Sequence, residues 1–279
     1  QDVYLYIIKY VMLQAEQIQQ NWDNFLNIID THITGERKDK LLEFYKQYED
    51  RFVLLPASHK KAYHNCFPGG YIDHVLRVIE CSLKLDKVWR EMGMADTYTT
   101  EELIFSAINH DLGKFGTLEQ TSVFDNDNEW EIKNRGELYK FNTNITYMSV
   151  PDRSLHILFS IGVTMTENEY IAIKTHDGMY DDANKSYLLS YMPETKPRSS
   201  LLYVLHHADM MAARIEYEVE WLPKLLKNNI QANQSNTTSN VVVNSANTNT
   251  VTNKVLNDSS AYQNSSVRVT LSDPYFSDA

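Results

Sequence analysis

Four residues, at three distant places in the sequence, carry side chains of the kinds that bind divalent cations in proteins. They are His74, the adjacent pair His110 and Asp111, and Asp209. Neutral imidazole and carboxylate are the usual nitrogen and oxygen donors of protein metal sites. A shared site forms only if the helices that carry these residues direct them inward and toward one another. The surrounding elements therefore determine whether the four residues form one site.

The helix predicted over residues 71–90 directs His74 toward protein. Pro68-Gly69-Gly70 breaks the chain before it, and apolar residues then recur at steps of three and four. The charged residues of this helix form a narrow strip. His74 belongs instead to the apolar row of Val78, Cys81 and Leu85, which is typical of a buried face.

A second helix is predicted over residues 100–112, with His110 and Asp111 near its end. Thr99 and Glu102 have the spacing of a capping box, and Gly113 ends the helix. Both His110 and Asp111 continue apolar rows. An ionised aspartate on such a face is costly unless a cation or several hydrogen-bond donors compensate its charge.

Asp209 lies on a helix that is predicted from Ser199 or Ser200 to about Glu220. Beside its core stripe runs a row that lacks Lys, Glu and Gln, formed by Leu202, His206, Asp209 and Ala213. We predict that this row faces a pocket, and we prefer His206 to His207 as a site residue. Thr166 and Glu169 repeat the capping-box spacing and predict a further helix that ends near His176.

A purely structural interpretation of these residues stays open. An inward-facing histidine is commonly a hydrogen-bonded core residue, and Asp111 and Asp209 would be satisfied by helix capping or by pairing with Arg153 or Arg214. The coincidence of all four on inward faces favours a metal site.

The motifs around these residues resemble those of the HD-domain phosphohydrolases. The resemblance rests on the segment His64-Asn65-Cys66-Phe67-Pro68-Gly69-Gly70-Tyr71-Ile72-Asp73-His74, followed by Asn109-His110-Asp111-Leu112-Gly113-Lys114. With the THDG at 175–178 and the LHHAD at 205–209, it is most similar to the branch with bacterial 3′–5′ exoribonucleases and related phage proteins. The resemblance covers roughly residues 56–216 and implies an all-α HD-domain helical bundle.

The resemblance also implies the metal ligands. His74, His110, Asp111 and Asp209 would bind a first ion. In family members with two metals the aspartate of the doublet bridges them, and His176 and His206 are the candidates for the second ion here. The cofactor would be one or two divalent ions, with manganese, iron, magnesium or nickel expected before zinc because the set has no thiolate.

The function implied is hydrolysis of a phosphoester or phosphoanhydride of a nucleotide by attack of metal-bound hydroxide. Asp111 would be a catalytic residue as well as a ligand. Lys114 would contact the substrate phosphate as a point charge, and His64 would contact the phosphate or protonate the leaving group. Arg135 is a weaker candidate for substrate binding, in a segment, 129–142, that we interpret as a hairpin or lid.

Two alternatives to a nucleotide hydrolase remain. A 3′–5′ exonuclease on single-stranded RNA or DNA is favoured by the motifs. It is disfavoured by the net charge of −11 and by the missing nucleic-acid-binding OB module that some family members carry. A structural or assembly protein that retains the HD fold is the second alternative.

The resemblance implies an HD domain over residues 56–227, preceded by an N-terminal helical segment (1–55), and the composition marks an irregular Asn/Ser/Thr-rich C-terminal arm (228–279). We expect this arm to join subunits in a homo-oligomer. The two cysteines suit a reducing compartment, and the apolar stretch 3–13 is too short to cross a bilayer. The prediction is therefore a cytoplasmic protein, in the host cytoplasm if viral, with no membrane partner.

Overall fold

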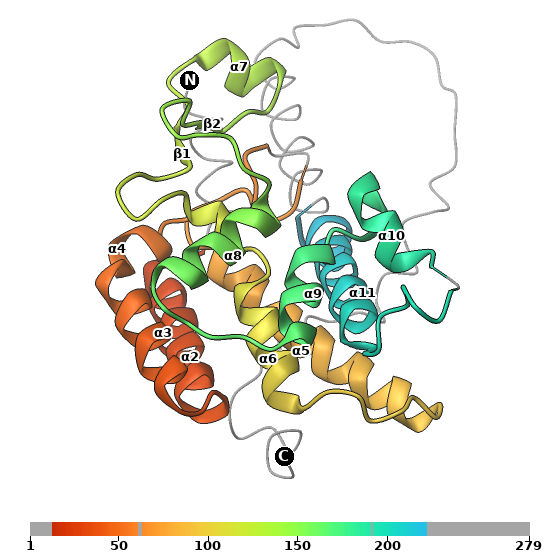
Figure 1. Cartoon of the computed structure of the whole chain (residues 1–279). Helices are drawn as coiled ribbons and strands as arrows, with labels where there is room; N and C mark the ends of the chain where they lie inside the picture. The colour runs from red at the N-terminus through yellow and green to blue at the C-terminus, as the bar shows by residue number, and fades with distance from the viewer. Residues whose placement is uncertain (1–12, 61–62, 191, 222–279) are drawn as a thin grey trace, which may run out of the picture.

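The computed structural model describes residues 13–60, 63–190 and 192–221, which form mainly helices (Figure 1), as the sequence predicts. The α-helices are α2 (Ala15–His32), α3 (Glu36–Gln47), α4 (Glu49–Phe52), α5 (Gly70–Glu91), α6 (Thr100–Asn109), α7 (Glu129–Asn134), α8 (Val150–Ser160), α9 (Glu167–Thr175), α10 (Lys185–Leu188) and α11 (Leu201–Arg214). Short 3₁₀ turns are η1 (Leu112–Phe115), η2 (Gly178–Tyr180) and η3 (Asp182–Asn184), and α11 continues as the π-helix η4 (Ile215–Trp221).

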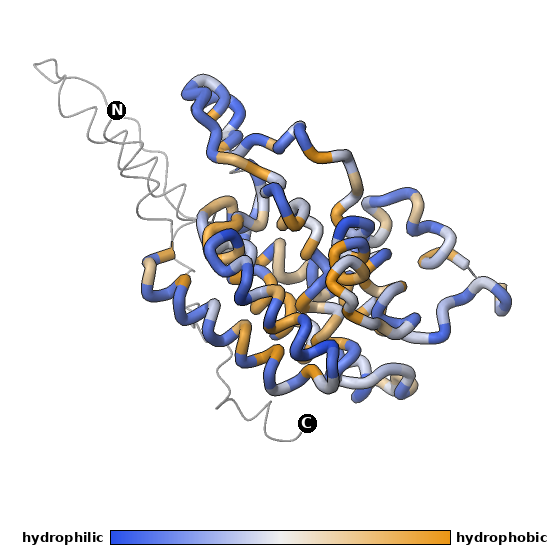
Figure 2. The backbone as a smooth tube through the Cα atoms, turned by 60° about the vertical axis from the view of Figure 1, so that its left-hand side comes forward, coloured by the Kyte–Doolittle hydropathy of each residue, from blue (hydrophilic) through white to orange (hydrophobic). Residues whose placement is uncertain are grey.

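Helix α5 lies at the centre of the helical packing. It contacts α11, α6 and α2, while α9 packs against α6 and α11, and α8 packs against η1 and α9. Apolar and hydrophilic residues alternate along these helices (Figure 2), as expected of helices that bury one face. The result is that α5, α6, α9 and α11 approach one another at one place, where the functional side chains lie.

The described part of the N-terminal segment shares its core with the rest of the chain. Helices α2 and α3 lie side by side (Figure 1), and the fully buried rings of Phe25, Tyr45 and Phe52 join the same apolar cluster as α5 and α6. The ring of Phe52 stacks on that of Phe115 at 4.6 Å between centroids. Residues 13–55 thus support the segment that follows the His-Asp doublet.

Both predicted capping boxes are present. The hydroxyl of Thr99 accepts from the amide of Glu102 at 3.1 Å, and the hydroxyl of Thr166 accepts from the amide of Glu169 at 3.2 Å. Each glutamate side chain accepts in return from the backbone amide of its threonine.

The predicted end of the second helix is wrong. Helix α6 stops at Asn109, so His110 and Asp111 lie in the turn between α6 and η1 and not inside the helix. The cause is Ser154 on α8, whose hydroxyl donates to the carbonyl of His110 at 2.9 Å and accepts from the amide of Gly113 at 2.7 Å. A contact from another helix therefore takes the place of the helical bonds.

The predicted hairpin exists, with a different first strand. Strands β1 (Val123–Asp125) and β2 (Tyr139–Phe141) pair antiparallel with Val123 opposite Phe141, and α7 lies between them. The first strand therefore precedes the predicted segment 129–142. That this hairpin acts as a lid stays a prediction.

The predicted C-terminal arm, 228–279, and almost all of the apolar stretch 3–13 lie outside the described residues. Within the described part of the chain, no helix combines the length and hydropathy that crossing a bilayer requires.

Arg37 is expected to be a strong stability determinant of the fold. Its guanidinium donates to both oxygens of Glu169 at 2.9 Å, and Glu169 is fully buried. We expect Arg37→Met to lower the free energy of unfolding by about 3 kcal/mol, because a buried carboxylate loses its counter-charge. Urea unfolding followed by circular dichroism measures this.

The neighbouring Lys38 is the matched control. It pairs with Asp30, whose side chain is 61 % exposed, so Lys38→Met should cost less than about 1 kcal/mol. Adding Glu169→Gln to the Arg37 variant should recover stability. Equal effects of the Arg37 and Lys38 variants would contradict the prediction.

Candidate metal centre

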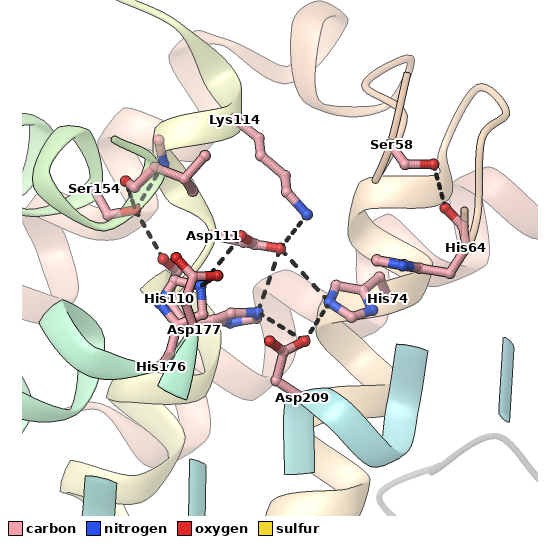
Figure 3. A network of polar contacts seen from close by, with 12 residues as sticks. Ser58, His64, His74, His110, Asp111, Lys114, Ser154, His176, Asp177 and Asp209 are labelled. Carbon is pink, nitrogen blue, oxygen red and sulfur yellow. Dashed lines mark hydrogen bonds and ion pairs between the residues drawn. The ribbon is translucent and has the colours of Figure 1, made fainter. Parts of the chain in front are cut away.

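All of the predicted ligands except His206 converge at the meeting point of α5, the α6–η1 turn, the end of α9 and α11 (Figure 3). The Nε2 atom of His74 lies 3.1 Å from Oδ1 of Asp209 and 3.6 Å from Oδ2 of Asp111. The Nε2 atom of His110 lies 3.5 Å from Oδ2 of Asp111 and 3.8 Å from Oδ1 of Asp209. His176 approaches from the other side, with Nε2 3.6 Å from Oδ1 of Asp111.

The second ring nitrogen of each histidine is already engaged. Nδ1 of His110 donates to the carbonyl of Ala107 at 2.8 Å, and Nδ1 of His176 donates to the carbonyl of Ile173 at 2.8 Å. A carbonyl only accepts, so Nδ1 carries the proton in both rings. Nδ1 of His74 lies 3.0 Å from the carboxylate of Glu216. All three rings therefore turn Nε2, the usual ligand atom, toward the two aspartates.

These residues fit a divalent cation. Nε2 of His74 and of His110 are buried and make no hydrogen bond of acceptable geometry, a costly state for a polar atom. Ligand atoms about 2.1 Å from one ion lie about 3.0 Å apart at right angles and about 4.2 Å apart when opposite. The observed separations of 3.1 to 3.8 Å between these nitrogens and the aspartate oxygens fall in this range.

The electrostatics of the cluster favour positive charge. Burial opposes ionisation of Asp111, but Lys114 and His110 hold its pKa well below the usual range. Burial likewise opposes ionisation of Asp209, and His74 lowers its pKa. Against the effect of burial, Glu216 and Asp209 raise the pKa of His74 to about 10. The same balance, dominated by Asp111 and Asp177, raises the pKa of His176 to about 9.

The HN-x-x-x-GG motif builds the loop that brings His64 to this site. Asn65 adopts a left-handed conformation with φ 42°, and its amide donates to Asp73 on α5 at 3.1 Å. A Cβ at Gly70 would lie 2.1 Å from the carbonyl oxygen of Asn65, so only glycine fits there. The loop places the ring of His64 4.5 Å from that of His74.

The segment after the doublet positions Lys114 over the cluster. Its Nζ lies 2.5 Å from Oδ2 of Asp111, and its side chain keeps 24 % of its surface exposed. Gly113 is required beneath it, because a Cβ would lie 2.2 Å from the carbonyl of Val150 on α8. Arg51 holds the next loop, with its guanidinium 3.6 Å from the Phe115 ring centroid and bonds to the carbonyls of Phe115, Thr117 and Gln120.

His206 lies beside the cluster and not within it. Its Nδ1 is 2.8 Å from the carbonyl oxygen of His176, and its ring packs on Gly178. Among the described residues, the groups within coordinating distance include His176 but not His206. The hydrogen bond from Nδ1 of His206 to the carbonyl of His176 instead stabilises the end of α9. His207 points elsewhere, with its ring centroid 5.7 Å from that of Trp89.

Arg135 lies in the hairpin insertion. It follows α7, and its guanidinium lies 5.3 Å from the centroid of the Trp130 ring. The structure thus places Arg135 at the end of that short helix and not among the metal-facing side chains, and its predicted contact with substrate stays a prediction.

Two residues of the site were missed from sequence. Glu216 lies seven residues after Asp209, a spacing that returns to the same helix face and could have revealed it. Asp177 follows His176 directly, and its Oδ1 lies 3.7 Å from Nε2 of His176 with 44 % of its side chain exposed. No periodic signal marks Asp177, because it lies in a turn.

No family model, no curated protein and no solved structure matches the chain. The chemistry of the site therefore follows from its geometry. Buried imidazole nitrogens and carboxylates of five residues lie within a few ångströms of one another, and the ammonium of Lys114 contacts one of the carboxylates. Such an arrangement is suited to hold a divalent cation with an anion beside it.

We expect binding of Mn²⁺ to release protons from the site. With pKa values of about 10 and about 9, His74 and His176 are protonated at pH 7.5 without metal, and a ligand nitrogen must be deprotonated. The apparent affinity should therefore rise with pH from 6 to 9, by up to about tenfold per pH unit for each proton released. Isothermal titration calorimetry in buffers of different ionisation enthalpy measures the protons, and a binding enthalpy independent of the buffer would contradict the expectation.

A methyl group at Gly178 should disrupt the support of His176. Gly178 has φ +58°, and an added Cβ would lie 2.1 Å from Cε1 of His206. We expect Gly178→Ala to cost about 2–4 kcal/mol in urea unfolding, from left-handed strain and overpacking. Gly93→Ala is the control, because φ is +96° there and no atom lies within 4 Å of the added Cβ.

Removing the imidazole should relieve the clash. The variant Gly178→Ala with His206→Ala should lose less stability than the sum of the two single changes. Strict additivity would mean that the ring of His206 does not pack on Gly178.

Proposed function

We propose that this chain is a metal-dependent phosphohydrolase of the HD type that hydrolyses a phosphoester or phosphoanhydride of a nucleotide. The observation that carries the proposal is the convergence of His74, the His110–Asp111 pair and Asp209 beneath the ammonium of Lys114. The resemblance of the same residues to the HD motif also supports the proposal.

The same side chains would hold the cation. His74, His110, Asp111 and Asp209 form the primary set, and His176 faces the other oxygen of Asp111, where a second ion would bind. When bound, a divalent cation polarises a phosphoryl oxygen and makes water a stronger nucleophile at neutral pH. The protein contributes by fixing the ligand atoms before the ion arrives.

Lys114 supplies positive charge beside Asp111 and keeps part of its side chain exposed. Its ammonium is already drawn to Asp111, and the carboxylates around it raise its pKa against the effect of burial. It therefore stays charged over the whole physiological range. A phosphate that approaches the ligands would meet this ammonium, which reduces the repulsion between the phosphate and the two aspartates.

His64 is suited to hydrogen bonding and not to proton donation by an imidazolium. Burial, His74 and Lys114 hold its pKa well below the usual value, so the ring is neutral near pH 7. Its Nε2 is buried and makes no hydrogen bond within the described structure. A neutral ring beside the cluster can orient a phosphate oxygen or a water molecule. Of the two predicted roles of His64, contact with the phosphate is the better supported.

The charge distribution favours a small substrate over a nucleic acid. Besides the net charge of −11, the hairpin insertion after the Lys114 loop carries more acidic than basic residues. The acidic ones are Asp125, Asp127, Glu129, Glu131 and Glu137, against Lys133, Arg135 and Lys140. An extended phosphate backbone would be repelled there, whereas a mononucleotide needs only the site itself.

The test is phosphate release from a panel of ribo- and deoxynucleoside mono- and triphosphates with Mn²⁺. We expect turnover of at least one nucleotide, and a loss of at least about 100-fold in kcat on Asp111→Asn, because the central carboxylate is lost. Lys114→Met should mainly raise KM. Asp182→Asn and Lys185→Met are matched controls, because both residues are largely exposed on η3 and α10 and should leave turnover unchanged.

Labelled single-stranded RNA and DNA in the same assay separate the alternatives. Shortening of either strand while every nucleotide survives would replace the proposal with a 3′–5′ exonuclease. A chain that binds Mn²⁺ and processes neither kind of substrate would favour the structural interpretation.

A further inference from the structure

Two carboxylates from one helical stretch lie close to the two ring nitrogens of His74. Nε2 lies 3.1 Å from Asp209 on α11, and Nδ1 lies 3.0 and 3.3 Å from the two oxygens of Glu216 on η4. Seven residues span about two helical turns, so Asp209 and Glu216 project to the same side, toward α5. The change from α-helix to π-helix falls between them, at Ile215.

Glu216 has no exposed surface, and Nε of Arg77 lies 3.4 Å from its Oε1. Burial raises the pKa of Glu216, and His74 and Arg77 oppose this rise by stabilising the ionised form. An ionised carboxylate can only accept hydrogen bonds, and it is tolerated in a buried position only when donors surround it. The ring of His74 must therefore donate from Nδ1 to Glu216. This fixes the orientation of the ring and directs Nε2 at Asp111 and Asp209.

The position of His74 in its helix explains why this external acceptor is needed. His110 and His176 lie at the C-caps of α6 and α9, where the carbonyls three residues earlier have no helical amide to accept from. His74 lies inside α5, where each carbonyl already accepts from the amide four residues later. His74 therefore cannot donate to a free carbonyl of its own helix, as His110 and His176 do.

We propose that Glu216 is a positioning residue of the metal centre, which acts through His74 by holding its ring and increasing the basicity of Nε2. Carboxylate–histidine–metal arrangements work in this way. The inference rests on the metal centre of the proposed function, and it assigns a role to a residue outside the ligand set.

The experiment is a double-mutant cycle read by Mn²⁺ affinity, measured by calorimetry and electron paramagnetic resonance. We expect Glu216→Gln to weaken binding of Mn²⁺ about tenfold and Glu216→Leu by up to about 100-fold, because the outer acceptor is weakened or lost. In a His74→Ala background, Glu216→Gln should change the affinity by less than about twofold. Glu218→Gln is the control, on the same π-helix with its side chain 56 % exposed, and should leave the affinity unchanged.

A purely structural role would give a different pattern. Glu216→Gln would then weaken Mn²⁺ binding equally with and without the His74 ring, or would leave it unchanged in both, and either result overturns the proposal. The isosteric glutamine variant keeps the test valid if the leucine variant does not fold. Because the readout is affinity, loss of nucleotide hydrolysis in the wild type would remove the proposed reaction without affecting this result, whereas a wild type that binds no Mn²⁺ removes both.

Discussion

Two ionised carboxylates at the junction of four helical elements impose the main constraint on this structure. Asp111 keeps 5 % of its side chain exposed and Asp209 keeps 21 %, so water does little to solvate either charge. Neighbouring imidazoles and the ammonium of Lys114 offset the cost of burying these charges, because they lie within a few ångströms of the carboxylates and carry positive charge or can take up a proton. The helices around the junction must therefore stay in register, because any displacement leaves a buried charge without compensation.

The chain meets this constraint with close backbone approaches and with side chains that bond to backbone carbonyls. Gly70 and Gly113 allow backbone to pass where a Cβ would meet a carbonyl oxygen. Ser154 ends α6 and so turns the His-Asp doublet into the junction. Arg51 ties the loop after Lys114 to the N-terminal helices through three carbonyls, so residues far from the site stabilise its charged lysine.

The histidines show how helix position determines their partners. At a helix end, a free carbonyl three residues earlier fixes the ring without help from another element. Inside α5 the carbonyl three residues before His74 already accepts from a helical amide. The buried Glu216 on η4 therefore supplies the acceptor for Nδ1 of His74. The same need, an acceptor for the proton on Nδ1 that directs Nε2 at the aspartates, is thus met locally in two cases and by tertiary packing in the third.

The sequence by itself determined the four helices that carry the site (α5, α6, α9 and α11), the capping boxes of α6 and α9, and the inward direction of His74 and Asp209. These features depend on side-chain periodicity and on hydrogen bonds between residues three or four positions apart, which are visible in one dimension. Tertiary packing alone decided where α6 ends, because Ser154 belongs to another helix. It also decided that His206 supports the end of α9, and that Glu216 faces Nδ1 of His74. Those outcomes depend on which faces of distant helices meet. The seven-residue spacing places Glu216 on the face of Asp209, but it does not show which residue of α5 that face meets.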